Sequence, residues 1–292
     1  MIKQAIIPLA GLGTRLLPLT SVFAKELLPI NGKPGIEYII EECIDAGIKE
    51  IIFIISKKKM MIKNYFYNDL FYKNIIKKKK DPRIIIEYQK ILKYKKMIKF
   101  VYQNKPLGTG DAVLKTMKYI KGNYFLMLLP DDLIIKDNCS KSMIAIHKKY
   151  KTSIIASMKV DKKNVSRWGI YNVDKKIDKN NFIINSVIEK PKQKEAPSNN
   201  AVIGRYILPK SIFKKLLKLK PGKGAEIHIT DAIQSLINDN HKFIGHSFSG
   251  KYLDCGTMSG YIKSSLEISK LWNYVWLELV MLVLLVEYVF QT

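Results

Sequence analysis

Small residues and basic residues occur together near the N-terminus of this chain. Residues 10–18 read AGLGTRLLP, beginning with Ala10 and Gly11, and the segment KELLP follows at residues 25–29. Small side chains let backbone N–H groups approach oxygen atoms that a Cβ would hold off. Arg15 and Lys25 add two positive charges to the same region. This combination predicts a binding site for a polyphosphate.

The glycine pattern excludes two common nucleotide-binding loops. Leu16 stands where the dinucleotide fingerprint requires its third glycine, and no Gly-Lys-Ser/Thr follows as in a P-loop. The polyphosphate site therefore belongs to another class.

A pair of carboxylates follows an apolar run at residues 124–129. Asp131 and Asp132 come directly after it, and carboxylates at the end of a buried strand are suitable ligands for Mg²⁺. The alternative is an Asp pair that opens a turn or caps the next helix. With the glycine-rich loop at the same edge of the sheet, we favour metal binding.

A third group of polar residues is Glu189-Lys190-Pro191. The carboxylate can accept hydrogen bonds from sugar hydroxyls, and the lysine can reach a phosphate. Gly169 would let the backbone approach a sugar ring. Alone, this tripeptide is equally compatible with an exposed turn.

The elements that must position these residues alternate in type. Apolar runs at 3–8, 50–55, 99–103 and 124–129 are typical of buried strands. Helical spacing occurs at 36–44, and a helix is expected from about residue 111. The pattern of residues 60–99 predicts an additional helical segment with a loop at 77–82. This order predicts an α/β fold with a doubly wound, mostly parallel, Rossmann-like sheet.

After residue 150 the pattern changes to shorter strands, which predict an added β-rich portion. The expected strands are at 153–160, 169–173, 182–189 and 201–208, and the expected helices at 210–219 and 229–238. We expect one domain at 1–270, made of the halves 1–150 and 151–270.

The formal net charge of +25 over 292 residues raises the possibility of nucleic-acid binding. The lysines, however, are spread along the chain without zinc ligands or a known nucleic-acid-binding motif. A bias toward A/T-rich codons explains Lys, Ile, Asn and Tyr together, so no nucleic-acid partner is expected. Three widely spaced cysteines suit a reducing compartment, and we expect a cytoplasmic location.

Residues 271–292 form an atypical hydrophobic tail. Glu278 and Glu287 interrupt it, and its uncharged run is short for a bilayer, so no membrane span is expected. A subunit-interface helix, an interfacial anchor and an altered reading frame are the three interpretations, and the anchor is the least favoured.

Further motifs occur in a fixed order from Lys3 to Ser269. They are GTGDAVL, LPDD, WGIY, EKP, APSN, IGRY, EIHITDAI and DCGT. With AGLGTRLLP and KELLP, this set resembles the bacterial UTP–glucose-1-phosphate uridylyltransferases (UDP-glucose pyrophosphorylases) of the sugar nucleotidyltransferase family. The resemblance implies Mg²⁺-dependent transfer of UMP from UTP to α-D-glucose 1-phosphate, giving UDP-glucose and pyrophosphate. We also expect a homo-oligomer.

The resemblance also implies that residues 1–150 are a nucleotide-binding half and that the β-rich residues 151–270 are a sugar-binding, sugar-phosphate half. It implies a role for each site residue as well. The nucleotide-binding residues would be Ala10, Gly11, Glu26, Gln103 and Gly108. The sugar-phosphate residues would be Gly169, Glu189 and Lys190, the metal ligands Asp131 and Asp254, and the catalytic cations Arg15, Lys25 and Lys190.

Two alternatives stay open at this point. One is a glucose-1-phosphate thymidylyltransferase, because uracil and thymine differ by one methyl group. The other is a non-catalytic basic binding protein that retains the fold, against which the intact set of charged site residues argues. The four histidines, at 147, 228, 241 and 246, are interpreted as structural.

Overall fold

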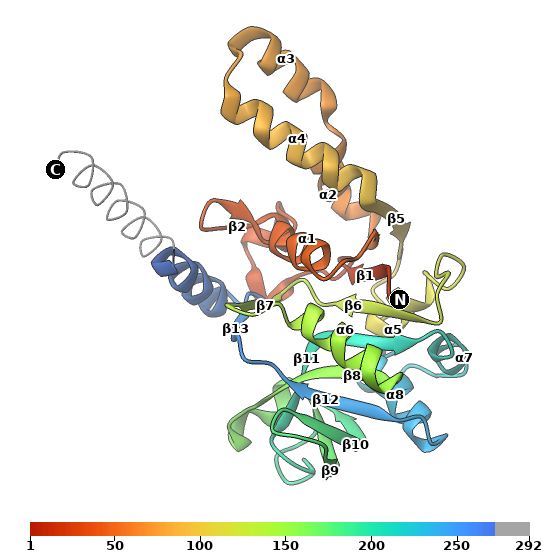
Figure 1. Ribbon diagram of the computed structural model, residues 1–292. Coiled ribbons are helices and arrows are strands. Elements are labelled where there is room, and N and C mark those ends of the chain that lie inside the picture. The colour runs from red at the N-terminus through yellow and green to blue at the C-terminus, as the bar shows by residue number, and fades with distance from the viewer. Residues whose placement is uncertain (272–292) are drawn as a thin grey trace, which may run out of the picture.

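A nine-stranded sheet forms the centre of the protein (Figure 1). The computed structural model describes residues 1–271; residues 272–292, most of the hydrophobic tail, lie outside the described part. In spatial order the sheet runs β5-β4-β1-β6-β11-β8-β12-β10-β9. The strands, in chain order, are β1 (Gln4–Pro8), β4 (Glu50–Ile55), β5 (Ile98–Tyr102), β6 (Tyr124–Leu128), β8 (Ser153–Lys159), β9 (Gly169–Lys176), β10 (Asn181–Glu189), β11 (Asn200–Pro209) and β12 (Phe243–Ser247).

Strand direction changes across the sheet. β5, β4, β1 and β6 are parallel neighbours, as expected of a doubly wound half. β11 is antiparallel to both β6 and β8, and β10 is antiparallel to both β12 and β9. The α/β prediction is confirmed, and the sheet as a whole is mixed. Because β11 pairs with β6, one sheet continues from residues 1–150 into residues 151–270.

The sheet separates two apolar cores, and alternate side chains along each strand point into one core and then the other. In β1, Ala5 and Ile7 face one core and Ile6 the other; in β4, Phe53 and Ile54 divide in the same way. This double burial explains why both strands read as continuous apolar runs. The first core includes α1 (Gly35–Asp45), α2 (Met60–Tyr67) and α6 (Cys139–Tyr150). The second includes α5 (Thr109–Leu114), α7 (Ile212–Leu216) and α8 (Ile229–Asn238).

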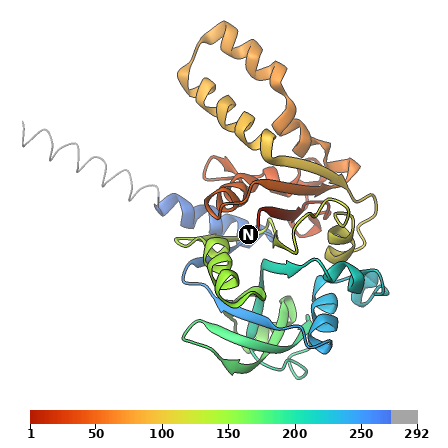
Figure 2. The ribbon, with the colours of Figure 1, turned by 45° about the vertical axis from the view of Figure 1, so that its right-hand side comes forward.

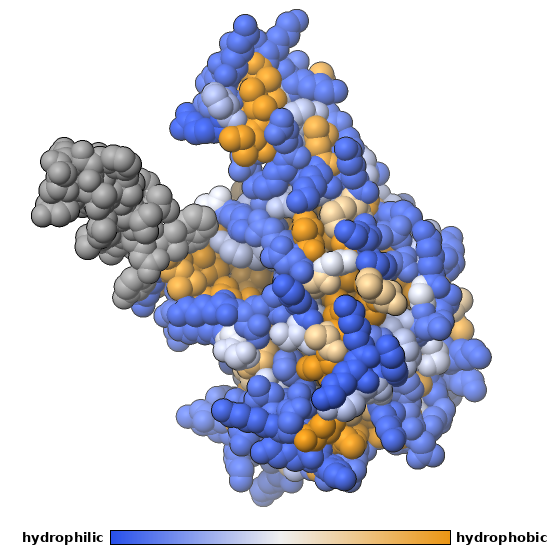
Figure 3. Space-filling view, viewed as in Figure 1, coloured by the Kyte–Doolittle hydropathy of each residue, from blue (hydrophilic) through white to orange (hydrophobic). Residues whose placement is uncertain are grey.

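A helical hairpin projects from the sheet domain in both ribbon views (Figures 1 and 2). It consists of α3 (Asp69–Lys79) and α4 (Pro82–Met97). Asp81 accepts a hydrogen bond from the Arg83 backbone N–H, and Pro82 opens α4. The loop predicted at 77–82 is shorter, because α3 continues to Lys79 and only Lys80 and Asp81 separate the two helices. Hydrophilic residues cover most of the face seen in Figure 3, with apolar residues in a strip along the hairpin.

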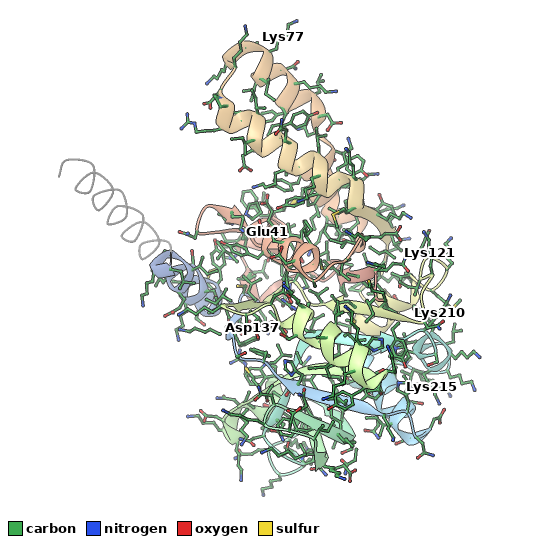
Figure 4. The ribbon with its side chains drawn as sticks, viewed as in Figure 1. Glu41, Lys77, Lys121, Asp137, Lys210 and Lys215 are labelled. Carbon is green, nitrogen blue, oxygen red and sulfur yellow. The ribbon has the colours of Figure 1, made fainter. Side chains whose placement is uncertain are left out.

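Lysines lie at widely separated places on the molecule. In Figure 4, Lys77 is at the hairpin tip, whereas Lys121, Lys210 and Lys215 lie on the sheet domain. Within residues 1–271, no helix has the length and apolar character needed to span a membrane.

Several elements were not predicted. They are α6, β12 and two small ladders, β2 (Pro29–Ile30) with β3 (Lys33–Pro34) and β7 (Asp132–Ile135) with β13 (Lys251–Asp254). The helix expected at 210–219 is shorter, because α7 covers only Ile212–Leu216. The β7–β13 ladder places Asp254 directly opposite Asp132. It therefore connects the two acidic motifs of the sequence.

Candidate active site

A cleft of about 780 Å³ opens at the carboxyl ends of β1 and β6. Every site residue singled out from the sequence lines it: Ala10, Gly11, Arg15, Lys25, Glu26, Gln103, Gly108, Asp131, Gly169, Glu189, Lys190 and Asp254. Residues from both halves of the chain therefore share one cavity, at the sheet edge where open α/β folds bind their ligands.

The glycine-rich loop connects β1 to the short 3₁₀ turn η1 (Thr14–Leu16). Gly13 has φ +70°, a left-handed conformation that favours glycine. Next to Gly11, the space that a Cβ would occupy is open. The loop thus presents backbone without side-chain cover, and the exposed Arg15 guanidinium lies beyond it, 3.7 Å from the Asp131 carboxylate.

Lys25 is the most enclosed cation of the cleft. It lies on the 3₁₀ turn η3 (Lys25–Leu27), and its Nζ donates to Asp131 Oδ2 at 2.7 Å. Burial opposes the lysine charge, but the Asp131 carboxylate, assisted by Glu26, outweighs it and raises the pKa of Lys25. Conversely, burial disfavours the Asp131 charge, and Lys25 more than compensates, so that the pKa of Asp131 is lowered.

Asp131 and Asp254 converge on Gly256. A Cβ there would lie 2.7 Å from Asp131 Oδ2 and 3.2 Å from Asp254 Oδ1, so only glycine leaves the space between the carboxylates open. Asp254 also accepts a hydrogen bond from Arg167 at 2.7 Å. Two carboxylates beside an open space are a donor set that suits Mg²⁺, which usually keeps several waters and takes further oxygens from phosphates. Within residues 1–271, no group of three or more acidic, His or Cys side chains forms a fuller metal site.

Asp132 differs from its neighbour in the chain. Its Oδ2 accepts from the Gly204 backbone N–H at 2.9 Å, and its Oδ1 accepts from the Tyr252 hydroxyl at 2.7 Å. Burial, with repulsion from Asp131, raises the pKa of Asp132 to about 6. Asp132 therefore connects β7 to β11 and β13, while Asp131 faces the basic residues of the cleft.

The amide of Gln103 is held by two acceptors at another part of the cleft. Its Nε2 donates to Asp111 Oδ2 at 2.8 Å and to the Gly108 carbonyl at 3.2 Å. Gly108 has φ +95°, and a Cβ on it would lie 2.6 Å from the Ile227 carbonyl oxygen. This close approach packs the loop before α5 against the EIHITDAI segment.

Strand pairing builds the remaining end of the cleft. Glu189 on β10 is opposite Gly169 on β9, and Thr230 Oγ1 donates to Glu189 Oε2 at 2.8 Å. A Cβ on Gly169 would lie 3.0 Å from Thr230 Cγ2. Lys190 Nζ lies 3.5 Å from Glu189 Oε1. The WGIY, EKP and EIHITDAI motifs meet here.

Sequence reasoning missed some residues of the cleft wall. Arg167, His228 and Tyr252 line it, although His228 was interpreted as structural only. The position of His228 within the EIHITDAI motif was the available signal. For Arg167 the signal was its place directly before the WGIY motif. Tyr252 had none, because the β7–β13 ladder that brings it to the cleft was not predicted.

Comparisons with known proteins show the family of this chain. The nucleotidyl transferase family model matches residues 4–270. The chain is 37% identical over 273 residues to a protein of Streptococcus pyogenes serotype M3 named UTP–glucose-1-phosphate uridylyltransferase 2, covering 91% of this chain and 90% of that protein.

Solved structures are similar over nearly the same span. A UDP-glucose pyrophosphorylase in complex with UDP-glucose has a TM-score of 0.80 at 36% identity, covering 92% of this chain and 99% of that one. A UTP-bound UGPase from Acinetobacter baumannii has a TM-score of 0.81 at 33% identity, covering 92% and 93%. The chain therefore belongs to the nucleotidyl transferase family.

Proposed function

We propose that the protein transfers UMP from UTP to α-D-glucose 1-phosphate in a Mg²⁺-dependent reaction that yields UDP-glucose and pyrophosphate. The observation that carries this proposal is the shared cleft, in which basic residues and two carboxylates lie together with a cluster formed by Glu189, Gly169 and Thr230. The activities named for the relatives point to the same reaction.

Gln103 provides a chemical reason for choosing uracil. Because its Nε2 donates to Asp111 and to the Gly108 carbonyl, its Oε1 is the atom left to accept from a ligand. The N3–H of uracil is a matching donor, whereas N3 of cytosine is an acceptor. We assign the base to this end of the cleft, with Ala10, Gly11 and Glu26 as further nucleotide contacts.

The charges then account for the chemistry. A phosphate oxygen of glucose 1-phosphate attacks the α-phosphorus of UTP, and the bond to the departing pyrophosphate breaks opposite to it. The nucleophile is already anionic, so no general base and no covalent enzyme intermediate are required. The obstacle is repulsion between two anions, so catalysis rests on positioning and charge neutralisation. We assign neutralisation to Arg15, Lys25 and Lys190.

Asp131 and Asp254 are the residues that would hold Mg²⁺. When bound, the ion would supply positive charge at phosphate oxygens. Lys25 already contacts Asp131, so its ammonium group is within the same charge cluster and can donate to a phosphate instead. The cleft thus keeps its acidic and basic groups paired until substrates arrive.

The sugar phosphate is assigned to the opposite end. Glu189 can accept from sugar hydroxyls, Gly169 leaves room for the ring, and Lys190 can reach the phosphate. On this assignment, residues 1–150 supply the nucleotide half and residues 151–270 the sugar-phosphate half of one domain at 1–270. A homo-oligomer and a cytoplasmic location stay predictions.

A pyrophosphate-release assay tests the proposal directly. Four nucleoside triphosphates are paired with several sugar 1-phosphates, with and without Mg²⁺. UTP with glucose 1-phosphate is expected to give the highest kcat/KM. A tenfold preference for dTTP would instead favour the thymidylyltransferase, and no release from any pair would favour the non-catalytic binding protein.

A further inference from the structure

The basic run Lys57–Lys59 contains one lysine that differs from the others. Lys57 and Lys58 are exposed, whereas Lys59 is only 7% exposed. All three form the 3₁₀ turn η4, directly after β4. Codon bias explains the abundance of surface lysines but gives no reason for a buried one. Lys59 therefore needs a structural explanation of its own.

Lys59 is buried against a carboxylate of the cleft. Its Nζ donates to both Glu26 Oε1 and Oε2, each at 2.8 Å, and the Glu26 side chain is 1% exposed. Burial outweighs the attraction of Glu26 and lowers the pKa of Lys59. A buried ion pair of this kind adds little stability over a packed apolar pair. Its clearest effect is to fix the orientation of Glu26.

A second contact joins the same two segments. The Ala24 backbone N–H donates to Met61 Sδ at 3.0 Å. Residues 59–61 thus hold residues 24–26 at two points. These two contacts fix the position of the turn η3, from which Glu26 points toward Lys59 and Lys25 points toward Asp131. The segment after β4 is therefore an outer support for the turn that presents two cleft residues.

We propose that Lys59 is a positioning residue for the nucleotide: it holds the Glu26 carboxylate and thereby sets the turn that aims Lys25 at the triphosphate. This inference rests on the proposed function, because it assigns the nucleotide to the η3 side of the cleft. Lys59 does not line the cleft and acts through Glu26.

Removal of the Lys59 charge has a specific consequence. Glu26 would be left as a buried carboxylate without its partner, and Lys25 is a neighbouring cation whose charge already interacts with Glu26. Glu26 would then turn toward Lys25 and leave the position from which it contacts the nucleotide, and it would compete with Asp131 for Lys25. Affinity for UTP should therefore fall, while the glucose 1-phosphate end, built from β9, β10 and α8, should be unaffected.

The test compares Lys59→Met with Lys58→Met in the full chain. Both substitutions remove one positive charge from the same turn, but Lys58 is exposed. Lys59→Met is expected to weaken UTP binding, measured by calorimetry without sugar phosphate, by at least tenfold. It should raise the KM for UTP without changing the KM for glucose 1-phosphate more than twofold. Lys58→Met should match the wild type in all three values.

Two further variants separate positioning from folding. Lys59→Arg keeps the charge and should bind UTP within about threefold of the wild type. The double variant Glu26→Gln/Lys59→Met removes both buried charges, so it should recover the melting temperature but not the UTP affinity.

Equal UTP affinity in Lys59→Met and the wild type would overturn the proposal, whatever the melting temperatures. So would full recovery of UTP affinity in the double variant, because Glu26 would then have no role in binding. If instead the wild type releases no pyrophosphate from UTP and glucose 1-phosphate, the proposed function fails, and this outcome is distinct from equal affinities in an active enzyme.

Discussion

Lys25 and Asp131 are separated by 106 residues in the chain, yet Lys25 Nζ lies 2.7 Å from Asp131 Oδ2. The carboxyl edge of the parallel half explains this, since η3 follows β1 and Asp131 follows β6, and these two strands are parallel neighbours. The pair balances two enclosed charges in the unliganded cleft. Each member also has a separate role in the proposed reaction, one toward phosphate and one toward metal.

The first prediction concerns Lys25. Lys25→Ala should lower kcat by about 10² or more, the range found when a preorganised group that stabilises transition-state charge is removed. The loss should appear mainly in kcat, because the interaction strengthens as charge develops. Steady-state kinetics with both substrates varied would measure it.

Lys78→Ala is the matched control. Lys78 is an exposed residue of α3 in the projecting hairpin, where one charge contributes little. Its kcat and KM should stay within about twofold of the wild type. Comparison at low and high salt would detect any general effect of surface charge. A damaging Lys78→Ala beside a silent Lys25→Ala would contradict the site assignment.

The second prediction separates the two adjacent aspartates. Asp131→Asn should keep the fold and lower turnover by about 10² or more, with a weaker response to Mg²⁺. Asp132→Asn should mainly lower the melting temperature, because an amide cannot accept both the Gly204 N–H and the Tyr252 hydroxyl. Mg²⁺ titrations of activity, with thermal melts, distinguish the roles. The reverse pattern would move the metal assignment to Asp132.

The third prediction uses two glycines that both have a positive φ. Gly108 and Gly32 have φ +95° and +76°, but a Cβ on Gly108 would lie 2.6 Å from the Ile227 carbonyl oxygen, whereas nothing is within 4 Å at Gly32. Gly32→Ala should cost about 1 kcal/mol in the free energy of unfolding, from backbone strain alone. Gly108→Ala should cost more and also raise the KM for UTP.

Denaturant unfolding and UTP kinetics on both variants check this. If Gly108→Ala resembles Gly32→Ala in stability and in KM, the packing of the loop against Ile227 is unimportant for the nucleotide site.

The sequence patterns predicted which residues line one cleft, and the roles of these residues stay predictions. Short motifs follow strands, and parallel strands end at one edge, so residues such as Asp131 and Lys25 could be placed together from their positions in the chain alone. The resemblance supplied Asp254, whose strand, β13, has a pattern too short to predict. Two-residue and four-residue ladders such as β2–β3 and β7–β13 form only because the rest of the chain brings them together.

The mixed half of the sheet shows a second limit. The apolar patterns of the strands in this half, β8 to β12, predict that the strands are present but do not predict whether they run parallel or antiparallel to their neighbours. β11 pairs with β6 and β8 through long-range contacts, and nothing in its residues encodes which neighbour it takes. The burial of Lys59 is similar: three consecutive lysines look equivalent until Glu26 is placed beside one of them.

The last prediction concerns pH and three histidines, of which His246 is buried and His147 and His241 are partly buried. Burial lowers the pKa of His147, His241 and His246 from the ordinary value of 6.5. Below pH 6.5 the unfolded chain therefore binds more protons than the folded chain, and stability must fall as the pH drops toward each folded-state pKa. Each histidine contributes at most about 1.4 kcal/mol of unfolding free energy per pH unit in that window.

His246→Gln isolates one contribution. Glutamine can still donate to Asn181 Oδ1, which His246 Nδ1 contacts at 3.0 Å, but it does not titrate. Denaturant unfolding at pH 7.5, 6.5 and 5.5 should show a smaller loss of unfolding free energy for this variant than for the wild type. The difference between the two proteins is the proper readout, since Asp132, with its pKa raised to about 6, acts in the opposite direction at lower pH. Parallel losses in both proteins would show that His246 keeps an ordinary pKa despite its burial.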